Sequence, residues 1–284
     1  MSSFEAFVLG VVQGLTEFLP VSSTAHLRII PALAGWEDPG AGFSAVIQCG
    51  TLIAVFLALR RDVVDLVVGG WSGLCTGRPF GTPTSRAAWL VVLGTLPIVA
   101  VGFAARHLIR GEARRLEVVT GALLAATLLM VGAELVAAWR SRRGTAGRDG
   151  LAGVRVADGL TMGLFQVLAL VPGTSRSGVT ISAGMLCGLD RATAARFSFL
   201  LSLPAVAAAG LLEAWQQREA IFGTSADATA TVIGIVTATA VGYASIRWLL
   251  RLLTSHTLWP FIAYRLALAA LLVASVSRGW VTAT

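Results

Sequence analysis

Two polar segments interrupt the apolar sequence of this chain about half a chain apart. They read Gln13-Gly-Leu-Thr-Glu-Phe-Leu-Pro-Val-Ser-Ser-Thr-Ala-His26 and Gln166-Val-Leu-Ala-Leu-Val-Pro-Gly-Thr-Ser-Arg-Ser-Gly178. Charged and clustered hydroxyl side chains are costly away from water, so an apolar protein rarely keeps them without a function. Similar breaks in corresponding positions of two halves predict one polar site where the breaks meet.

Composition predicts an all-α polytopic membrane protein. The chain is 56% hydrophobic and only 13% charged, with a mean hydropathy of +0.78, whereas soluble domains carry about 25% charged residues. A bilayer requires about 20 consecutive apolar residues from each spanning helix. Six segments approach that length: 41–59, 87–108, 116–139, 192–213, 228–252 and 261–277.

Three further apolar segments, 4–19, 157–171 and 177–189, are too short to span. They flank the polar breaks, so we expect each break to form a re-entrant helix–loop–helix. Irregular backbone at membrane depth is tolerated only when it is buried in protein or lines a cavity. Gly10 and Gly14, four residues apart in the first short segment, predict that its helix packs closely on a neighbour.

The two halves of the chain match each other at a nearly constant offset, which indicates a duplication. We expect a single membrane domain, 1–284, with a first repeat at about 1–139, a linker at about 140–156 and a second repeat at about 157–284. The offset is 153 for Gly10 with Gly163 and Gln13 with Gln166, 152 for 20–24 with 172–176, and 154 for Phe43-Ser44 with Phe197-Ser198.

Arginine placement predicts how the halves are oriented. All 22 basic residues are Arg, and basic connections tend to stay in the cytoplasm. The 140–155 connection holds five of them, which places it inside together with 60–86 and 247–260. The connections at 109–115 and 214–227 then fall outside, although the first carries Arg110, Arg114 and Arg115 and the second carries Arg218.

It follows that segment 41–59 runs inward and its partner 192–213 runs outward, so the two halves have opposite topology.

The net charge of +7 raises the alternative of a nucleic-acid-binding protein. The sequence has no basic run interleaved with stacking aromatic side chains, and its arginines sit between apolar segments, which excludes that class.

The first break carries a carboxylate, three hydroxyls and an imidazole. Gln13 and Glu17 are four residues apart and share one face of a helix. For Glu17 the interpretations are a catalytic or ligand-binding acid, or a packing face with one satisfied carboxylate. For the hydroxyls at 22–24 they are a helix cap, or a nucleophile and phosphate-contacting loop with His26 as the base.

The second break is suited to binding an anion. Gly173 frees the backbone, while Thr174 and Ser175 offer hydroxyls. Arg176 offers a bidentate fork for phosphate, and the loop opens a helix whose N-terminal amides also favour an anion. With the groups of the first break, this set suits phosphoryl chemistry on a membrane-embedded anion. Arg196 is either an interfacial arginine or a weaker candidate for orienting the substrate.

These residues resemble the motifs of the undecaprenyl-diphosphate phosphatase family, which is also known for bacitracin resistance. The family's first motif resembles Glu-Gly-x-Thr-Glu-Phe-Leu-Pro-Ile-Ser-Ser-Thr-Gly-His-Leu, and this chain has Gln13-Gly-Leu-Thr-Glu-Phe-Leu-Pro-Val-Ser-Ser-Thr-Ala-His-Leu27. The second motif, Pro-Gly-x-Ser-Arg-Ser-Gly, is intact at 172–178. Segments at 43–51 and 196–198 are also similar, so the resemblance covers essentially the whole chain.

The resemblance implies hydrolysis of undecaprenyl diphosphate to undecaprenyl phosphate and inorganic phosphate, which recycles the lipid carrier for peptidoglycan. It also implies inverted repeats in a bacterial plasma membrane, a site open to the extracytoplasmic side, and a divalent cation, Mg²⁺ or Ca²⁺. We expect the lipid substrate and membrane lipids as partners, and leave a homodimer open. The implied catalytic residues are Glu17, Ser23, His26 and Arg176, with Glu17 also the metal ligand, and the implied phosphate or support contacts are Gln13, Ser22, Thr24, Thr174, Ser175 and Arg196.

One departure concerns Gln13, where the family usually has Glu. An amide cannot act as a base and is a poorer metal ligand, so Glu17 remains the only carboxylate of the motif. The sequence leaves open whether Ser23 or His26 attacks the terminal phosphorus or activates a water. His26 has a suitable unperturbed pKa, about 6.5. The rival hypothesis is a transporter or flippase, because broken helices in inverted repeats also occur in transporters; the acid–hydroxyl–imidazole set favours the hydrolase.

Overall fold

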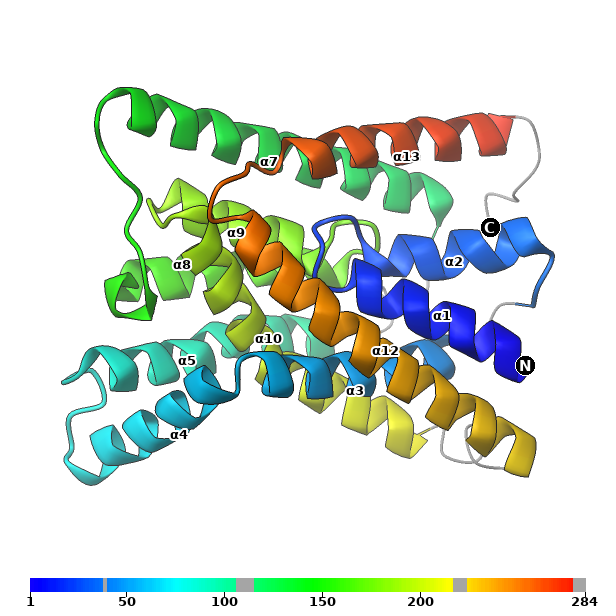
Figure 1. Cartoon of the computed structure of the whole chain (residues 1–284), viewed down its shortest axis with the longest axis horizontal. Helices are drawn as coiled ribbons and strands as arrows, with labels where there is room; N and C mark the ends of the chain where they lie inside the picture. The colour runs from blue at the N-terminus through cyan, green and yellow to red at the C-terminus, as the bar shows by residue number, and fades with distance from the viewer. Residues whose placement is uncertain (38–39, 106–114, 217–223, 278–284) are drawn as a thin grey trace.

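The computed structural model describes residues 1–37, 40–105, 115–216 and 224–277, which are all helical or irregular (Figure 1). The predicted all-α class is confirmed. The described residues form eleven α-helices and two short 3-10 helices: α1 Ser3–Thr16, α2 Ser23–Ala34, α3 Gly40–Ala58, α4 Arg60–Cys75, α5 Pro83–Ala104, α7 Leu116–Arg142, η2 Leu151–Gly153, α8 Val156–Gln166, η3 Val167–Leu170, α9 Arg176–Leu186, α10 Arg191–Gln216, α12 Ser225–Leu252 and α13 Trp259–Ser277.

Four helices are long and apolar enough to cross a membrane, and they coincide with four of the six predicted spans. They are Pro83–Ala104, Glu117–Arg142, Arg191–Glu213 and Asp227–Leu252. The predicted span 41–59 qualifies only as one half of a pair, α3 with α4, that bends by 82°. The sixth predicted span, 261–277, lies within α13, whose described part up to Ser275 falls among the shorter apolar helices. The full span at 261–277 stays a prediction.

Most of the predicted connection 60–86 is therefore helical, since α4 continues the chain beyond the bend and packs on α5. The predicted outer connection 109–115 lies outside the described residues except for Arg115, and the connection 214–227 lies outside them at 217–223. Arg110, Arg114 and Arg218 belong to those undescribed parts.

The two polar breaks separate pairs of short helices, as the sequence predicts. α1 and α2 both have their outer ends at the right of Figure 1 and meet near the middle of the molecule. α8 enters from the left, and the C-terminal end of α9 returns to that side. There Arg140, at the end of α7, donates to the carbonyls of Met185 and Leu186, at 2.7 Å each. The two helix pairs thus open at opposite ends of the molecule.

Close glycine contacts fix each pair against the rest of the bundle. α1 packs on α12, and a Cβ atom added at Gly14 would lie 2.8 Å from the backbone nitrogen of Gly242. The predicted close approach at Gly10 and Gly14 is confirmed. α8 packs on α5 in the same way, with Gly163 directly against Gly94. A side chain at these positions would push two backbones apart.

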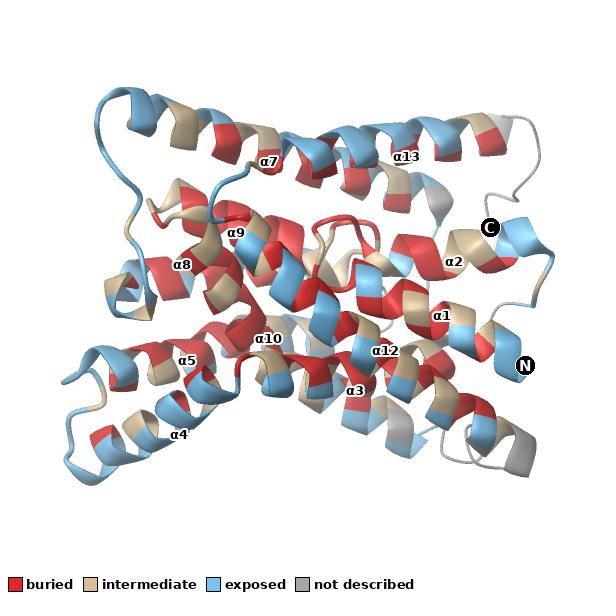
Figure 2. Ribbon diagram, viewed as in Figure 1, coloured by how far each residue is buried: buried red, intermediate tan, exposed pale blue. Residues whose placement is uncertain are grey.

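Buried residues concentrate on the inward faces of the helices and in the loop between α1 and α2 (Figure 2), whereas the loop between η3 and α9 is mostly half-buried. Phe18, Phe197 and Phe199 are almost fully buried and belong to the largest core cluster. The largest fully buried side chain, however, is Arg265 of α13. A charged side chain therefore lies at the centre of this apolar molecule, where it donates hydrogen bonds to the backbone of both loops.

Candidate functional site

Glu17 lies where the first short helix ends. α1 stops at Thr16 with Glu17 as its C-cap, and Pro20 lacks the N–H that a further helical turn would need. Glu17 Oε2 accepts hydrogen bonds from Gln13 Nε2 at 3.0 Å and from Ser23 Oγ at 2.7 Å. The predicted shared face of Gln13 and Glu17 is confirmed, and the hydroxyl of Ser23 comes with it.

An ion pair joins the two loops, which meet as the sequence predicts. Arg176 Nη2 lies 3.0 Å from Glu17 Oε1, and the two side chains are only 11% and 7% exposed. The hydroxyl of Ser177 also donates to the carbonyl of Leu19, at 3.1 Å. One carboxylate thus holds a guanidinium on one oxygen and a hydroxyl on the other. Little water competes for either contact.

Both loops turn into their second helix through a serine in the left-handed backbone region. Among the described residues, Ser22 with φ 75° and Ser175 with φ 69° are the non-glycine residues of this kind. The hydroxyl of Ser175 caps α9, since it accepts from Gly178 N at 3.2 Å. The predicted helix cap does not form at Ser22, whose hydroxyl instead lies 3.2 Å from that of Thr24. Such backbone strain persists where the surroundings enforce it, often at functional sites.

A pocket of about 200 Å³ opens over the ion pair. Its apolar walls come from α5, α10 and the start of the second loop. Its polar lining comes mostly from the two loops, and comprises Thr16, Glu17, Ser22, Ser23, Thr24, Gln48, Ser175 and Arg176. Six of the predicted site residues are thus brought together. The pocket holds an acid, a cation and hydroxyls in one enclosure.

His26 lies beside this pocket without lining it. Its Nδ1 is 2.7 Å from the carbonyl of Ser22, which can only accept, so Nδ1 carries the proton. In the neutral imidazole Nε2 then accepts from the hydroxyl of Tyr264, at 2.6 Å. Tyr264 also stacks on the imidazole ring. Both ring nitrogens are engaged, and the ring holds the strained serine in place.

Two further predicted residues lie away from the pocket. Arg196 forms an ion pair with Asp62 of α4. The pocket is lined on the same helix by Ala205 and its neighbours, nine residues further on, or about 14 Å along the helix axis. Thr174 is buried, and its carbonyl accepts from Arg265 Nη2 at 3.1 Å.

Arg265, like Tyr264, contributes to the site although the sequence motifs do not include it. It is fully buried and donates to the carbonyls of Pro20 at 3.3 Å, Gly173 at 3.4 Å and Thr174 at 3.1 Å. It also donates to Thr127 of α7 at 2.8 Å. One guanidinium therefore fastens both loops to α7 and α13. Its signal in the sequence was a charge inside the apolar segment 261–277, with no motif around it.

The oxygen ligands of the pocket suit a metal cation only when an anionic ligand is bound beside it. Among the described residues no group of three or more His, Cys, Asp or Glu side chains gathers to bind a metal. Glu17 is the one carboxylate of the pocket. Gln13 Oε1 and Arg176 Nη1 are buried and have no partner. Mg²⁺ typically takes one or two carboxylates together with phosphate oxygens, which is what these residues leave room for.

Comparison with known proteins gives similarity over the whole chain. The family model described as "Bacitracin resistance protein BacA" matches residues 6–271. The Undecaprenyl-diphosphatase of Chlorobaculum tepidum is 46% identical over 98% of this chain and 99% of its own. That of Chlorobium limicola is 45% identical over the full length of both chains. That of Myxococcus xanthus is 47% identical over 98% of this chain and 91% of its own.

Proposed function

The chain belongs to the bacitracin resistance protein BacA family, and we propose that the pocket between its two loops is the site of the activity for which its relatives are named. The protein is an undecaprenyl-diphosphatase. It hydrolyses undecaprenyl diphosphate to undecaprenyl phosphate and inorganic phosphate, and so returns the lipid carrier to peptidoglycan synthesis. The observation that carries the proposal is the double engagement of Glu17, with Ser23 on one oxygen and Arg176 on the other.

Arg176 binds the diphosphate. Nη2 of its guanidinium is held by Glu17, and Nη1 is buried without a partner. A buried donor left without an acceptor costs about 1–3 kcal/mol, and a phosphate oxygen in the pocket removes that cost. Ser175, at the start of α9, adds a hydroxyl next to the amides of the helix N-terminus, which favour an anion.

Ser23 and Glu17 carry out the attack on the terminal phosphorus. Glu17 takes the proton of the nucleophile, which is either the Ser23 hydroxyl at 2.7 Å or a water in its place. The bond from phosphorus to the bridging oxygen breaks, and undecaprenyl phosphate leaves. In the first case water then hydrolyses the phosphoserine, and in the second case inorganic phosphate forms directly. His26 acts as a positioning residue, because both its ring nitrogens are engaged.

Glu17 would hold a divalent cation, Mg²⁺ or Ca²⁺, together with the substrate. The buried and unpartnered Gln13 Oε1 is the second protein oxygen available to it. When bound, such an ion neutralises charge on the diphosphate. With one carboxylate available, affinity for the ion depends on the substrate being present.

Several features support a site on the extracytoplasmic side of the plasma membrane. The pocket is lined by Ile98 of α5 and by 205–209 of α10, both in the helix halves that lead to the predicted outer connections. The two short-helix pairs open at opposite ends of the molecule (Figure 1), in keeping with inverted repeats. Ser22 and Ser175 share their unusual backbone at an offset of 153, the offset that also relates Gln13 to Gln166.

The test is phosphate release from undecaprenyl diphosphate by the purified protein in detergent. We expect release with Mg²⁺ or Ca²⁺, and a loss of about 100-fold or more in Glu17→Gln and Ser23→Ala, the usual scale for removing a proton-transfer group. Glu117→Gln, an exposed acid of α7, and Ser44→Ala of α3 are the matched controls. Full activity in both loop variants would place the chemistry elsewhere. Full activity in the presence of a chelator would contradict only the role of the cation, and not the roles of Glu17 and Ser23.

A further inference from the structure

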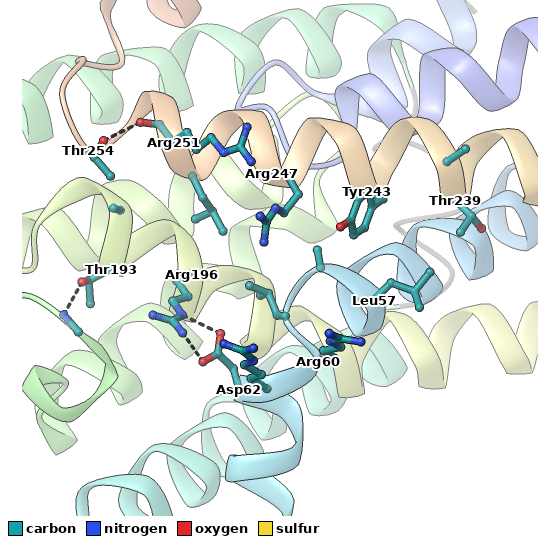
Figure 3. Close-up of a pocket in the computed structure, with 17 residues that line it drawn as sticks. Leu57, Arg60, Asp62, Thr193, Arg196, Thr239, Tyr243, Arg247, Arg251 and Thr254 are labelled. Carbon is teal, nitrogen blue, oxygen red and sulfur yellow. Dashed lines mark hydrogen bonds and ion pairs between the residues drawn. The ribbon is translucent and has the colours of Figure 1, made fainter.

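A second cavity, of about 1240 Å³, lies at the bend between α3 and α4, where α10 begins and α12 ends (Figure 3). None of the described residues lines both this cavity and the pocket over the loop ion pair. On α10 it is lined by Thr193 and Arg196, which lie about 14 Å before Ala205 of that pocket. The cavity is therefore a separate feature of the molecule.

Arginines from three different helices converge on this cavity. Figure 3 shows Arg196 paired with the buried carboxylate of Asp62. Among the described residues no carboxylate pairs with the other four arginine side chains, which are exposed. Together the lining holds one acid and five arginines: Arg60, Arg61, Arg196, Arg247 and Arg251.

Like charges around a concave surface repel one another, and low-dielectric walls strengthen their field. Positive-inside topology accounts for basic residues at this end of the molecule, and an anion lying among the four unpaired guanidiniums would relieve their mutual repulsion at this concave surface. Guanidinium forks match phosphate oxygens in pairs. The hydroxyls of Thr193, Tyr243 and Thr254 line the same cavity. We propose that this cavity is a second anion site, which binds a phosphate group without hydrolysing it.

The surroundings of the cavity favour a phosphate carried by a lipid. Apolar side chains of Leu57, Leu59 and Leu250 line it beside the arginines. Leu57 is 53% exposed and Trp248, next to Arg247 in sequence, is 50% exposed, as expected of side chains that face lipid and its interface. The arginine count places this end of the molecule in the cytoplasm. The ligand is then a phospholipid headgroup of the inner leaflet, preferably a phosphomonoester dianion, with its tail along the apolar edge.

The experiment counts lipids bound to the purified protein by native mass spectrometry in detergent. The probes are phosphatidic acid, a phosphomonoester, and phosphatidylcholine, which has no net charge. Arg247→Gln/Arg251→Gln is compared with Arg78→Gln/Arg142→Gln. Both pairs remove two charges from exposed arginines at the same end of the molecule, but only the first lines the cavity. Both pairs keep the loop pocket intact, so binding there cancels from the comparison.

We expect phosphatidic acid to bind the wild type and the Arg78/Arg142 variant alike. We expect its affinity for the Arg247/Arg251 variant to be lower by about tenfold or by a larger factor. If an excess of inorganic phosphate displaces the lipid, the site recognises phosphate alone; if it does not, the tail contributes. Equal loss in both variant pairs, or equal binding of phosphatidylcholine, would overturn the proposal. If the first pair fails to fold on gel filtration, Arg60→Gln/Arg61→Gln takes its place.

Discussion

At the scale of single residues, the site depends on side chains that serve both loops at once. Glu17 bridges Ser23 of its own loop and Arg176 of the other. Arg265 does the same for the backbone, since its guanidinium reaches carbonyls in both loops. A cation buried in this way, on backbone oxygens and one hydroxyl, shapes the site without lining the pocket.

We predict that Arg265→Met lowers the stability of the protein. Each buried carbonyl left without a donor costs about 1–3 kcal/mol, and several would be left at once. Arg265→Lys should restore only part of the loss, because an ammonium cannot span the acceptors that a planar fork reaches. The measurement is the thermal unfolding midpoint in detergent. Arg142→Lys, exposed at the end of α7, is the control, and a midpoint for Arg265→Met equal to it would refute the tethering role.

The motifs predicted the site residues that are close in sequence, and missed those that tertiary contacts supply. Glu17 and Arg176 were found because each lies in a polar break of an apolar segment. Tyr264 and Arg265 were not, because their partners lie up to 245 residues away along the chain. The sequence leaves Arg196 as a candidate substrate residue, because no local pattern indicates that its partner is Asp62, 134 residues away.

At the scale of elements, glycines set how close the helix pairs approach their neighbours. The packing of α1 on α12 leaves no room for a Cβ atom at Gly14. The bend between α3 and α4 was not predicted, since Leu59 ends an apolar run and two arginines follow without a proline or glycine. It arises where Asp62 in the first turn of α4 pairs with Arg196 of α10.

We predict that Gly14→Ala destabilises the protein by about 1–3 kcal/mol, the usual cost of inserting an atom into a packed interface. An added Cβ would meet backbone, which has little freedom to move. Gly132→Ala of α7 is the matched control, because nothing lies within 4 Å of its added Cβ and alanine favours a helix more than glycine does. The measurement is the thermal unfolding midpoint of each variant in detergent. An equal effect at both positions would show that α1 does not depend on this contact.

At the scale of the whole molecule, both predicted sites depend on an orientation in which the arginine-rich end faces the cytoplasm. Cys75 is exposed at the C-terminal end of α4, on the predicted inner side. Ser3, exposed at the start of α1, lies at the opposite end of the molecule (Figure 1). These two positions report the orientation directly.

We predict that an impermeant maleimide added to intact spheroplasts leaves Cys75 unlabelled, with Cys49→Ala and Cys187→Ala present to remove the other thiols. Permeabilised membranes should label it fully. The Ser3→Cys variant in a background without the three native cysteines should label in both conditions. The reverse labelling pattern at the two positions would show the opposite orientation in the membrane. The predicted sides of the loop pocket and of the arginine-lined cavity would then be exchanged.

Glu17 and Arg176 are proposed to join the two loops into one phosphatase site. The most direct measurement is phosphate release from undecaprenyl diphosphate by Arg176→Lys, compared with Arg196→Lys and the wild type. We predict a loss of about 100-fold or more for Arg176→Lys, the scale for removing one preorganised donor, because a lysine cannot hold Glu17 and a phosphate oxygen together. Arg196→Lys should stay close to the wild-type rate. Near-wild-type release by Arg176→Lys, or a larger loss at Arg196, would contradict the claim.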